Sequence, residues 1–226
     1  IKIMEYRLTL REYKLNRESK NIQLKGNVPR VVYVLEGTTL VREGSAKLCR
    51  LQLNSAMYSN EPLDIYFSDI KSIILIWELL GDSNLSGDYV SPVYNEVSKK
   101  LEAEINLDIE DKYVIRCDRV DFPLGGIAYT HTHKGPGIRY LLSGSLDVMV
   151  GGIRSHMAPK QAWFETGPEH VYAVASETCS TSFVRVMVLP NSIKGLKSIE
   201  YVLQDDKDKP KLQQYTMFVD TELFIK

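Results

Sequence analysis

The feature that most constrains the fold is a weak internal repeat between the two halves of the chain. The segment RVVYVLEGTTL (residues 30–40) resembles GIRYLLSGSLD (137–147), with a glycine aligned at an offset of 107. Further along, NEPLDIY (60–66) resembles TGPEHVY (166–172) at an offset of 106. Because the two similarities occur in the same order at nearly equal offsets, the sequence predicts a duplicated β unit.

Short β-branched or aromatic runs dominate both halves, and Gly, Asn, Ser or Pro separate them. Such runs are typical of strands in an all-β protein rather than of βαβ units. The pattern predicts double-sheet β architecture with strands at residues 31–35, 70–79, 113–115, 138–142, 146–150, 171–174 and 183–189.

One helix is expected between the two halves. Ser91 is a candidate N-cap with Pro92 at the first helical position, and Val93, Val97 and Leu101 recur at helical spacing. The expected organisation is therefore an N-terminal barrel (1–90), a helical linker (91–110), a C-terminal barrel (111–190) and an extension (191–226) that packs on a barrel or a partner subunit. Within the extension, YTMFV is expected to add an edge strand.

Charge and composition exclude several classes of function. The net charge is −1, and the basic residues are spread along the chain, so neither nucleic acid nor an anionic membrane is an expected partner. No run of 18 apolar residues occurs, and the first residues are too charged for a signal peptide. Three cysteines far apart, without a C-x-x-C motif, fit a reducing cytosol, so we expect a cytoplasmic location.

The histidines carry the strongest chemical signal. The chain has four, and none precedes His131. His131 and His133 are two residues apart, so on a strand they point to the same face. His170 opens another strand, which a barrel could bring alongside. Three neutral imidazoles in a closed pocket suit one borderline divalent metal ion, which could be iron, zinc, cobalt, nickel or copper.

These residues resemble the motifs of the cupin superfamily. The first cupin motif, G-x5-H-x-H-x3,4-E-x6-G, and the second, P-x-G-x2-H-x3-N, are matched in part by Gly125, His131, His133, Gly144, Gly167 and His170. The resemblance implies two tandem jelly-roll barrels, a bicupin, with His131, His133 and His170 as metal ligands. It also favours Fe²⁺ as the one metal ion per chain, over Zn²⁺, Ni²⁺, Co²⁺ or Mn²⁺. It also makes a homodimer an expectation.

The sequence departs from the cupin pattern at three positions. The motif glutamate falls on Gly137, the second motif's proline is Glu165, and its asparagine is Val174. The resemblance therefore implies a three-histidine site, in which Glu165 or Glu169 could supply a fourth contact.

Three further residues have two readings each. Gly137 leaves space at the metal, or it belongs to a tight turn. Arg139 shares its face and would either clamp an anionic substrate or pair with Glu165 or Glu169. Tyr129 would donate a hydrogen bond to substrate or oxygen, or is an ordinary wall residue. Arg139 and Tyr129 are the candidate catalytic residues.

The N-terminal half cannot build the same site. The offsets place Leu24, Gly26 and Asp64 at the positions that correspond to the three histidines. Its expected role is structural: packing, dimer contact or covering the other barrel.

Three functions remain open from the sequence. The first is a mononuclear Fe(II) dioxygenase, or another oxidoreductase, that acts on a small chelating organic substrate. The second is a Zn-dependent isomerase, cyclase or hydrolase with the same geometry. The third is a small-molecule-binding or sensing barrel that is not an enzyme.

Overall fold

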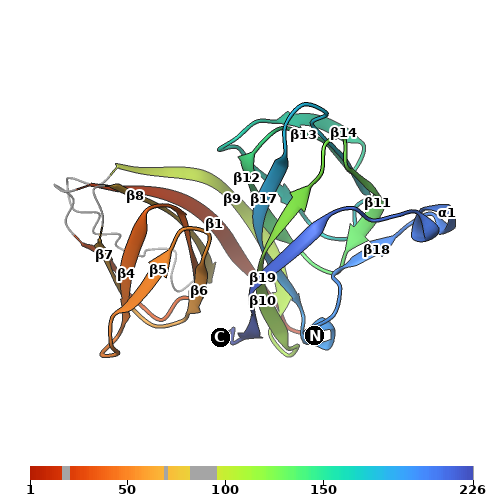
Figure 1. Ribbon diagram of the computed structural model, residues 1–226. Helices are drawn as coiled ribbons and strands as arrows, with labels where there is room; N and C mark the ends of the chain where they lie inside the picture. The colour runs from red at the N-terminus through yellow and green to blue at the C-terminus, as the bar shows by residue number, and fades with distance from the viewer. Residues whose placement is uncertain (17–20, 69–70, 82–95, 226) are drawn as a thin grey trace. The chain divides into compact units, whose positions relative to one another are not determined.

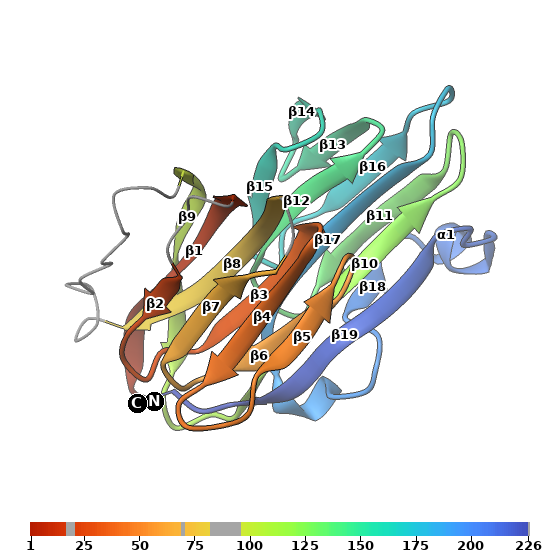
Figure 2. The ribbon, with the colours of Figure 1, turned by 60° about the vertical axis from the view of Figure 1, so that its left-hand side comes forward.

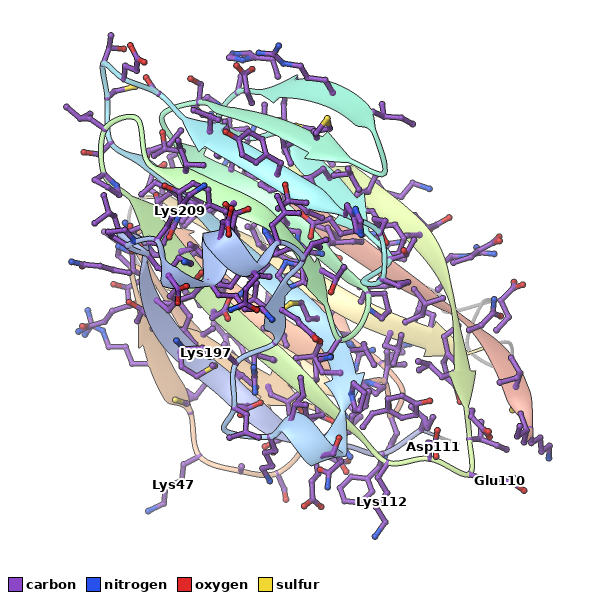
Figure 3. All side chains as sticks on the ribbon, turned by 90° about the vertical axis from the view of Figure 1, so that its right-hand side faces the viewer. Lys47, Glu110, Asp111, Lys112, Lys197 and Lys209 are labelled. Carbon is purple, nitrogen blue, oxygen red and sulfur yellow. The ribbon has the colours of Figure 1, made fainter. Side chains whose placement is uncertain are left out.

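The chain forms two compact β units (Figure 1). The structure is a computed structural model and describes residues 1–16, 21–68, 71–81 and 96–225. The N-terminal unit holds Ile1–Glu110 with the last residues from Phe224, and the C-terminal unit holds Asp111–Leu223. Glu110, Asp111 and Lys112 lie together in the turn where the chain passes from one unit to the next (Figure 3).

The N-terminal unit consists of two antiparallel sheets. One sheet has the strand order β6-β3-β8-β1-β9 and the other the order β2-β7-β4-β5. The strands are β1 (Ile3–Asn16), β2 (Ile22–Leu24), β3 (Arg30–Glu36), β4 (Thr38–Glu43), β5 (Cys49–Gln52), β6 (Ala56–Ser59), β7 (Leu63–Phe67), β8 (Lys71–Gly81) and β9 (Glu96–Asp108).

The C-terminal unit repeats this plan. Its sheets have the orders β15-β12-β17-β10-β19 and β14-β13-β16-β11-β18 (Figure 2). The strands are β10 (Tyr113–Phe122), β11 (Ile127–His133), β12 (Gly137–Ser143), β13 (Leu146–Val150), β14 (Ile153–Met157), β15 (Ala162–Glu165), β16 (Val171–Ala175), β17 (Thr181–Pro190), β18 (Ile199–Tyr201) and β19 (Gln214–Leu223). All seven expected strand segments lie in or overlap a strand.

The topology confirms the duplicated β unit. The first sheets of the two units correspond strand for strand, β6-β3-β8-β1-β9 with β15-β12-β17-β10-β19. The aligned glycines also adopt the same backbone conformation, with φ of +73° at Gly37 and +72° at Gly144. A Cβ would meet Lys71 O at 2.3 Å in one unit and Thr181 Oγ1 at 2.3 Å in the other. Glycine is therefore required at both turns.

The predicted linker helix is wrong. Residues 91–95 lie outside the described residues, but Glu96–Asp108 forms β9, which pairs with β1 from Lys14↔Glu96 to Ile3↔Asp108. The segment LEAEINL places apolar residues at 101, 103, 105 and 107, which is the period of a strand. Pairing with β1 along its length outweighs the helical spacing of the residues before it.

The C-terminal segment completes the C-terminal unit. β18 pairs with β11, and β19 pairs with β10 at the edge of its sheet, as the YTMFV pattern predicted. Between them, Gln204–Asp208 forms the short helix α1, and Asn191–Ile193 forms a 3₁₀ turn. No helix in the described ranges is both long and apolar enough to cross a bilayer.

The core of the C-terminal unit lies between its two sheets. Valines, alanines and aromatic residues from both sheets pack there, including Val120, Phe122, Trp163, Val171 and Phe183. Charged side chains are buried in the same unit, and they define the site described next.

Candidate metal centre

A small cavity lies inside the C-terminal barrel, lined by residues of both sheets. Its volume is about 30 Å³, which is room for about two water molecules. Most of the wall is apolar, but four polar side chains with buried functional groups face it. The polar lining residues are His131, His133, Glu165 and Arg185, and Tyr215 lies among the others.

The two histidines of β11 face each other across this cavity. His131 Nε2 lies 3.2 Å from His133 Nε2, and His131 Nδ1 lies 2.7 Å from the Tyr129 carbonyl oxygen. Since a carbonyl oxygen can only accept, Nδ1 of His131 donates, and a neutral ring then carries its lone pair on Nε2. Strand alternation correctly predicted that both rings point inward.

Burial keeps both imidazoles neutral. It lowers the pKa of His131, although the hydrogen bond to Tyr129 opposes the shift. It lowers the pKa of His133 well below the ordinary value, and the positive charge of Arg139 adds to the effect. A neutral imidazole is the form that binds a metal ion.

The metal-free protein is expected to lose stability as the pH falls below about 6.5. Because the folded pKa of both rings lies below the unfolded one, the unfolded chain binds more protons in that range. Each ring contributes up to about 1.4 kcal/mol per pH unit. Urea unfolding at pH 7.5, 6.5 and 5.5 measures the decline, which His133→Phe should reduce.

Glu165 brings a carboxylate to the histidine pair. Its Oε2 lies 3.3 Å from His133 Nε2 and 2.6 Å from Arg139 Nη2, and its Oε1 accepts a 2.8 Å hydrogen bond from Trp163 Nε1. β15 places Glu165 opposite Gly137 of β12, with its side chain inward. Of the two glutamates that could supply a fourth contact, Glu165 is the one that approaches the histidines.

Arg139 supports the carboxylate from behind. Its side chain is fully buried, forms the ion pair with Glu165, donates to the Gly137 carbonyl oxygen at 2.6 Å, and does not line the cavity. Burial lowers its pKa to about 10, a value at which it stays protonated at neutral pH. Of the two readings, the structure favours the ion pair with Glu165 over direct contact with a ligand.

The prediction that His170 completes the site is wrong. Its side chain is exposed and does not line the cavity. In the register of β11 with β16, Val171 lies opposite His131 and lines the cavity. Since neighbouring residues of a strand point to opposite faces, the residue before Val171 points outward.

Tyr129 also does not reach the cavity. The β11·β16 register shifts between Ala128 and His131, and Ala128 lines the cavity in its place. A β-bulge of this kind changes which side chains face inward. The Tyr129 ring instead lies 4.7 Å from Nζ of Lys209. Lys209 directly follows α1 (Figure 3).

Gly137 leaves no space at the site. A Cβ at this position would lie 2.5 Å from Val186 O and 2.7 Å from Met187 Cγ. The glycine therefore permits close approach of β12 and β17, and the reading in which it opens room for a substrate is wrong.

Arg185 is a cavity residue that belongs to no motif in the sequence. Its Nε and Nη2 donate to the two oxygens of Asp118, at 2.6 and 3.2 Å. Burial alone would lower the pKa of Arg185, but the adjacent carboxylate outweighs it and leaves the pKa raised. The available signal was a single arginine within an otherwise apolar strand, FVRVMV.

The corresponding positions of the N-terminal unit hold no such site. Leu24 is part of the hydrophobic core, Gly26 lies in a turn with φ of +75°, and Asp64 forms an ion pair with Arg42 at 2.6 Å.

The donor chemistry fits a divalent metal ion, but the donors are not assembled as a set of three. Two ligands at about 2.1 Å from an ion lie about 3.0–3.4 Å apart, which matches both the 3.2 Å and the 3.3 Å separations. In the described part of the chain, no three His, Cys, Asp or Glu side chains already form a group able to hold a metal. The spacing of the two imidazoles thus fits two ligands of one metal ion. Glu165 is the nearest candidate for a third ligand.

Comparisons with known proteins identify the fold. No protein-family model matches the sequence, and no curated protein sequence matches it. Among solved structures, a tryptophan-to-tyrosine variant of the oxalate decarboxylase of Bacillus subtilis matches with a TM-score of 0.62 and 11% identity, over 89% of this chain and 73% of that one.

Two further structures match over most of their length. Procruciferin, an 11S globulin from Brassica napus, has a TM-score of 0.59 at 8% identity, over 80% of this chain and 76% of that one. AerE from Microcystis aeruginosa has a TM-score of 0.58 at 10% identity, over 80% of this chain and 88% of that one. Since the matched structures are cupin-fold proteins, this chain has the cupin fold, in an architecture of two β units.

Proposed function

We propose that the C-terminal barrel binds one divalent metal ion through Nε2 of His131 and of His133, with the carboxylate of Glu165 as third donor. The observation that carries the proposal is the pair of neutral imidazoles with Nε2 atoms 3.2 Å apart. The bond from His131 Nδ1 to the Tyr129 carbonyl supports it, because metal-binding histidines are usually oriented in this way.

The size of the cavity also supports an ion. Sites for organic ligands usually have volumes of about 300–1,000 Å³, whereas this cavity has about 30 Å³. An ion with one or two small ligands fits that space. A larger substrate would need the wall to move.

The specific form of the proposal is an Fe(II) oxidoreductase of the dioxygenase type. Two histidines and one carboxylate are the donor set of many non-haem Fe(II) oxygenases, in which the metal supplies oxygen activation. In this chain Arg139 and Trp163 would hold Glu165 in place. The apolar walls would exclude bulk water.

Two other forms remain candidates. The same donors suit Zn²⁺ acting as a Lewis acid in an isomerase, cyclase or hydrolase. The small cavity favours a second function, a barrel that binds a metal or small ligand without turnover. The matched oxalate decarboxylase has Mn(II) centres, so Mn²⁺ belongs in the test.

Metal titration of the stripped protein tests the proposal. The full chain is treated with a chelator and reconstituted anaerobically with Fe(II), Zn(II) or Mn(II), and bound metal is measured by elemental analysis. We expect about one ion per chain. Oxygen uptake by the iron form with diketone, thiol or phenolic substrates would support the dioxygenase. Failure to retain any of the three metals would contradict the proposed function.

A further inference from the structure

Arg185 is the one cationic side chain among the cavity-lining residues of the described chain. Its Nε and Nη2 are engaged with Asp118, while Nη1 has no hydrogen-bond partner among the described residues. The guanidinium carbon lies 5.9 Å from the ring centroids of both Phe183 and Tyr215, which limits its movement. The residue is buried and lines the cavity, so Nη1 is an unused hydrogen-bond donor of a cavity-lining side chain.

The charges around the cavity make an anion the complementary ligand. Arg139 pairs with Glu165 and Arg185 pairs with Asp118, so the two guanidinium–carboxylate pairs cancel. A divalent metal in this site would therefore introduce about two positive charges into a buried region, and an anionic ligand would compensate them.

The volume limits how large that anion is. About 30 Å³ holds about two water molecules, which is close to the space of a carboxylate group and far below that of a drug-sized molecule. A planar oxyanion also matches the geometry in which guanidinium groups donate.

We propose that Arg185, rather than Arg139, is the residue that recognises ligand in this barrel, and that the ligand is a small carboxylate bound between Nη1 of Arg185 and the metal. This inference rests on the proposed metal site. Arg139 is excluded from the role because it is paired with Glu165 and does not line the cavity.

The test uses the full chain loaded with Co(II), whose visible absorption reports on ligands at the metal. Formate and acetate should change the spectrum, whereas acetamide, which has the shape of acetate but no charge, should not. Arg185→Lys should weaken acetate binding about 10- to 100-fold, because a hydrogen bond between charged groups is lost.

Arg116→Lys is the matched control. Arg116 is a buried arginine of the same unit that pairs with Asp220 at 3.0 Å, but it does not line the cavity. Its acetate affinity should equal that of the wild type. Equal affinities in Arg185→Lys and the wild type would overturn the inference. If Arg185→Lys does not fold, the wild type decides, since an equal response to acetamide and acetate would also overturn it.

The metal proposal and the anion inference can fail separately. A protein that takes up no cobalt contradicts the metal site alone. In that case, acetate is added to the metal-free protein and thermal unfolding is followed. Stabilisation by acetate that Arg185→Lys removes would still support the anion site, and its absence would overturn the inference.

Discussion

His133→Ala is expected to abolish metal binding, and His170→Ala is expected to leave it intact. His133 Nε2 lies between the two other donors, 3.2 Å from His131 Nε2 and 3.3 Å from Glu165 Oε2. Its removal therefore deletes the central ligand. The affinity should fall more than about 100-fold, since even losing a group that only orients a ligand costs about 10- to 100-fold.

The two alanine variants distinguish a metal site formed by His131, His133 and Glu165 from the three-histidine site implied by the cupin motifs. If three histidines held the metal, both variants would lose it. Because His170 is exposed, its substitution should also leave thermal stability close to that of the wild type. Bound metal is measured by elemental analysis after reconstitution, with circular dichroism as the check of folding. Loss of metal in His170→Ala would contradict the assignment of Glu165 as third donor.

The outcome for the histidines shows how far strand alternation reaches. Alternation within one strand placed His131 and His133 on the inner face, since that depends only on local geometry. The position of His170 depends on the pairing of β16 with β11, where a shift of one residue reverses the face. The bulge that turns Tyr129 away from the cavity belongs to the same strand pairing, and no residue type in the sequence predicts it.

The internal repeat was the more reliable guide to the fold. The glycine alignment identified two turns that share a positive φ and a close backbone contact, and these constraints hold whatever the surrounding sequence. The prediction of a linker helix is wrong because it relied on the spacing of Val97 and Leu101, which suits a helix. The residues after Leu101 alternate as in a strand, and the whole segment Glu96–Asp108 forms β9. Partners of buried charges, such as Arg139 with Glu165, were predicted only as alternatives, because side-chain pairing follows from the sheet register.

Arg139→Met is expected to destabilise the C-terminal barrel strongly. The substitution leaves the buried carboxylate of Glu165 without its cationic partner, and breaking a buried ion pair from one side costs about 3–5 kcal/mol. The measurement is denaturant unfolding of the metal-free protein at neutral pH. Trp163 donates to Glu165, and in a Trp77→Phe background its fluorescence reports on this barrel alone. The exposed Arg154, paired with Asp147 at 3.0 Å, is the control, and Arg154→Met should cost no more than about 1 kcal/mol.

The double variant Arg139→Met/Glu165→Gln should recover much of the lost stability, because it removes both charges together. Its metal affinity should nevertheless stay low, since an amide is a weaker ligand than a carboxylate for the proposed metals. Recovery of folding without recovery of metal binding would assign two roles to one ion pair: Arg139 compensates the charge of Glu165, and Glu165 serves as the metal donor. Wild-type stability in Arg139→Met alone would contradict the first role, and full metal binding in the double variant would contradict the second.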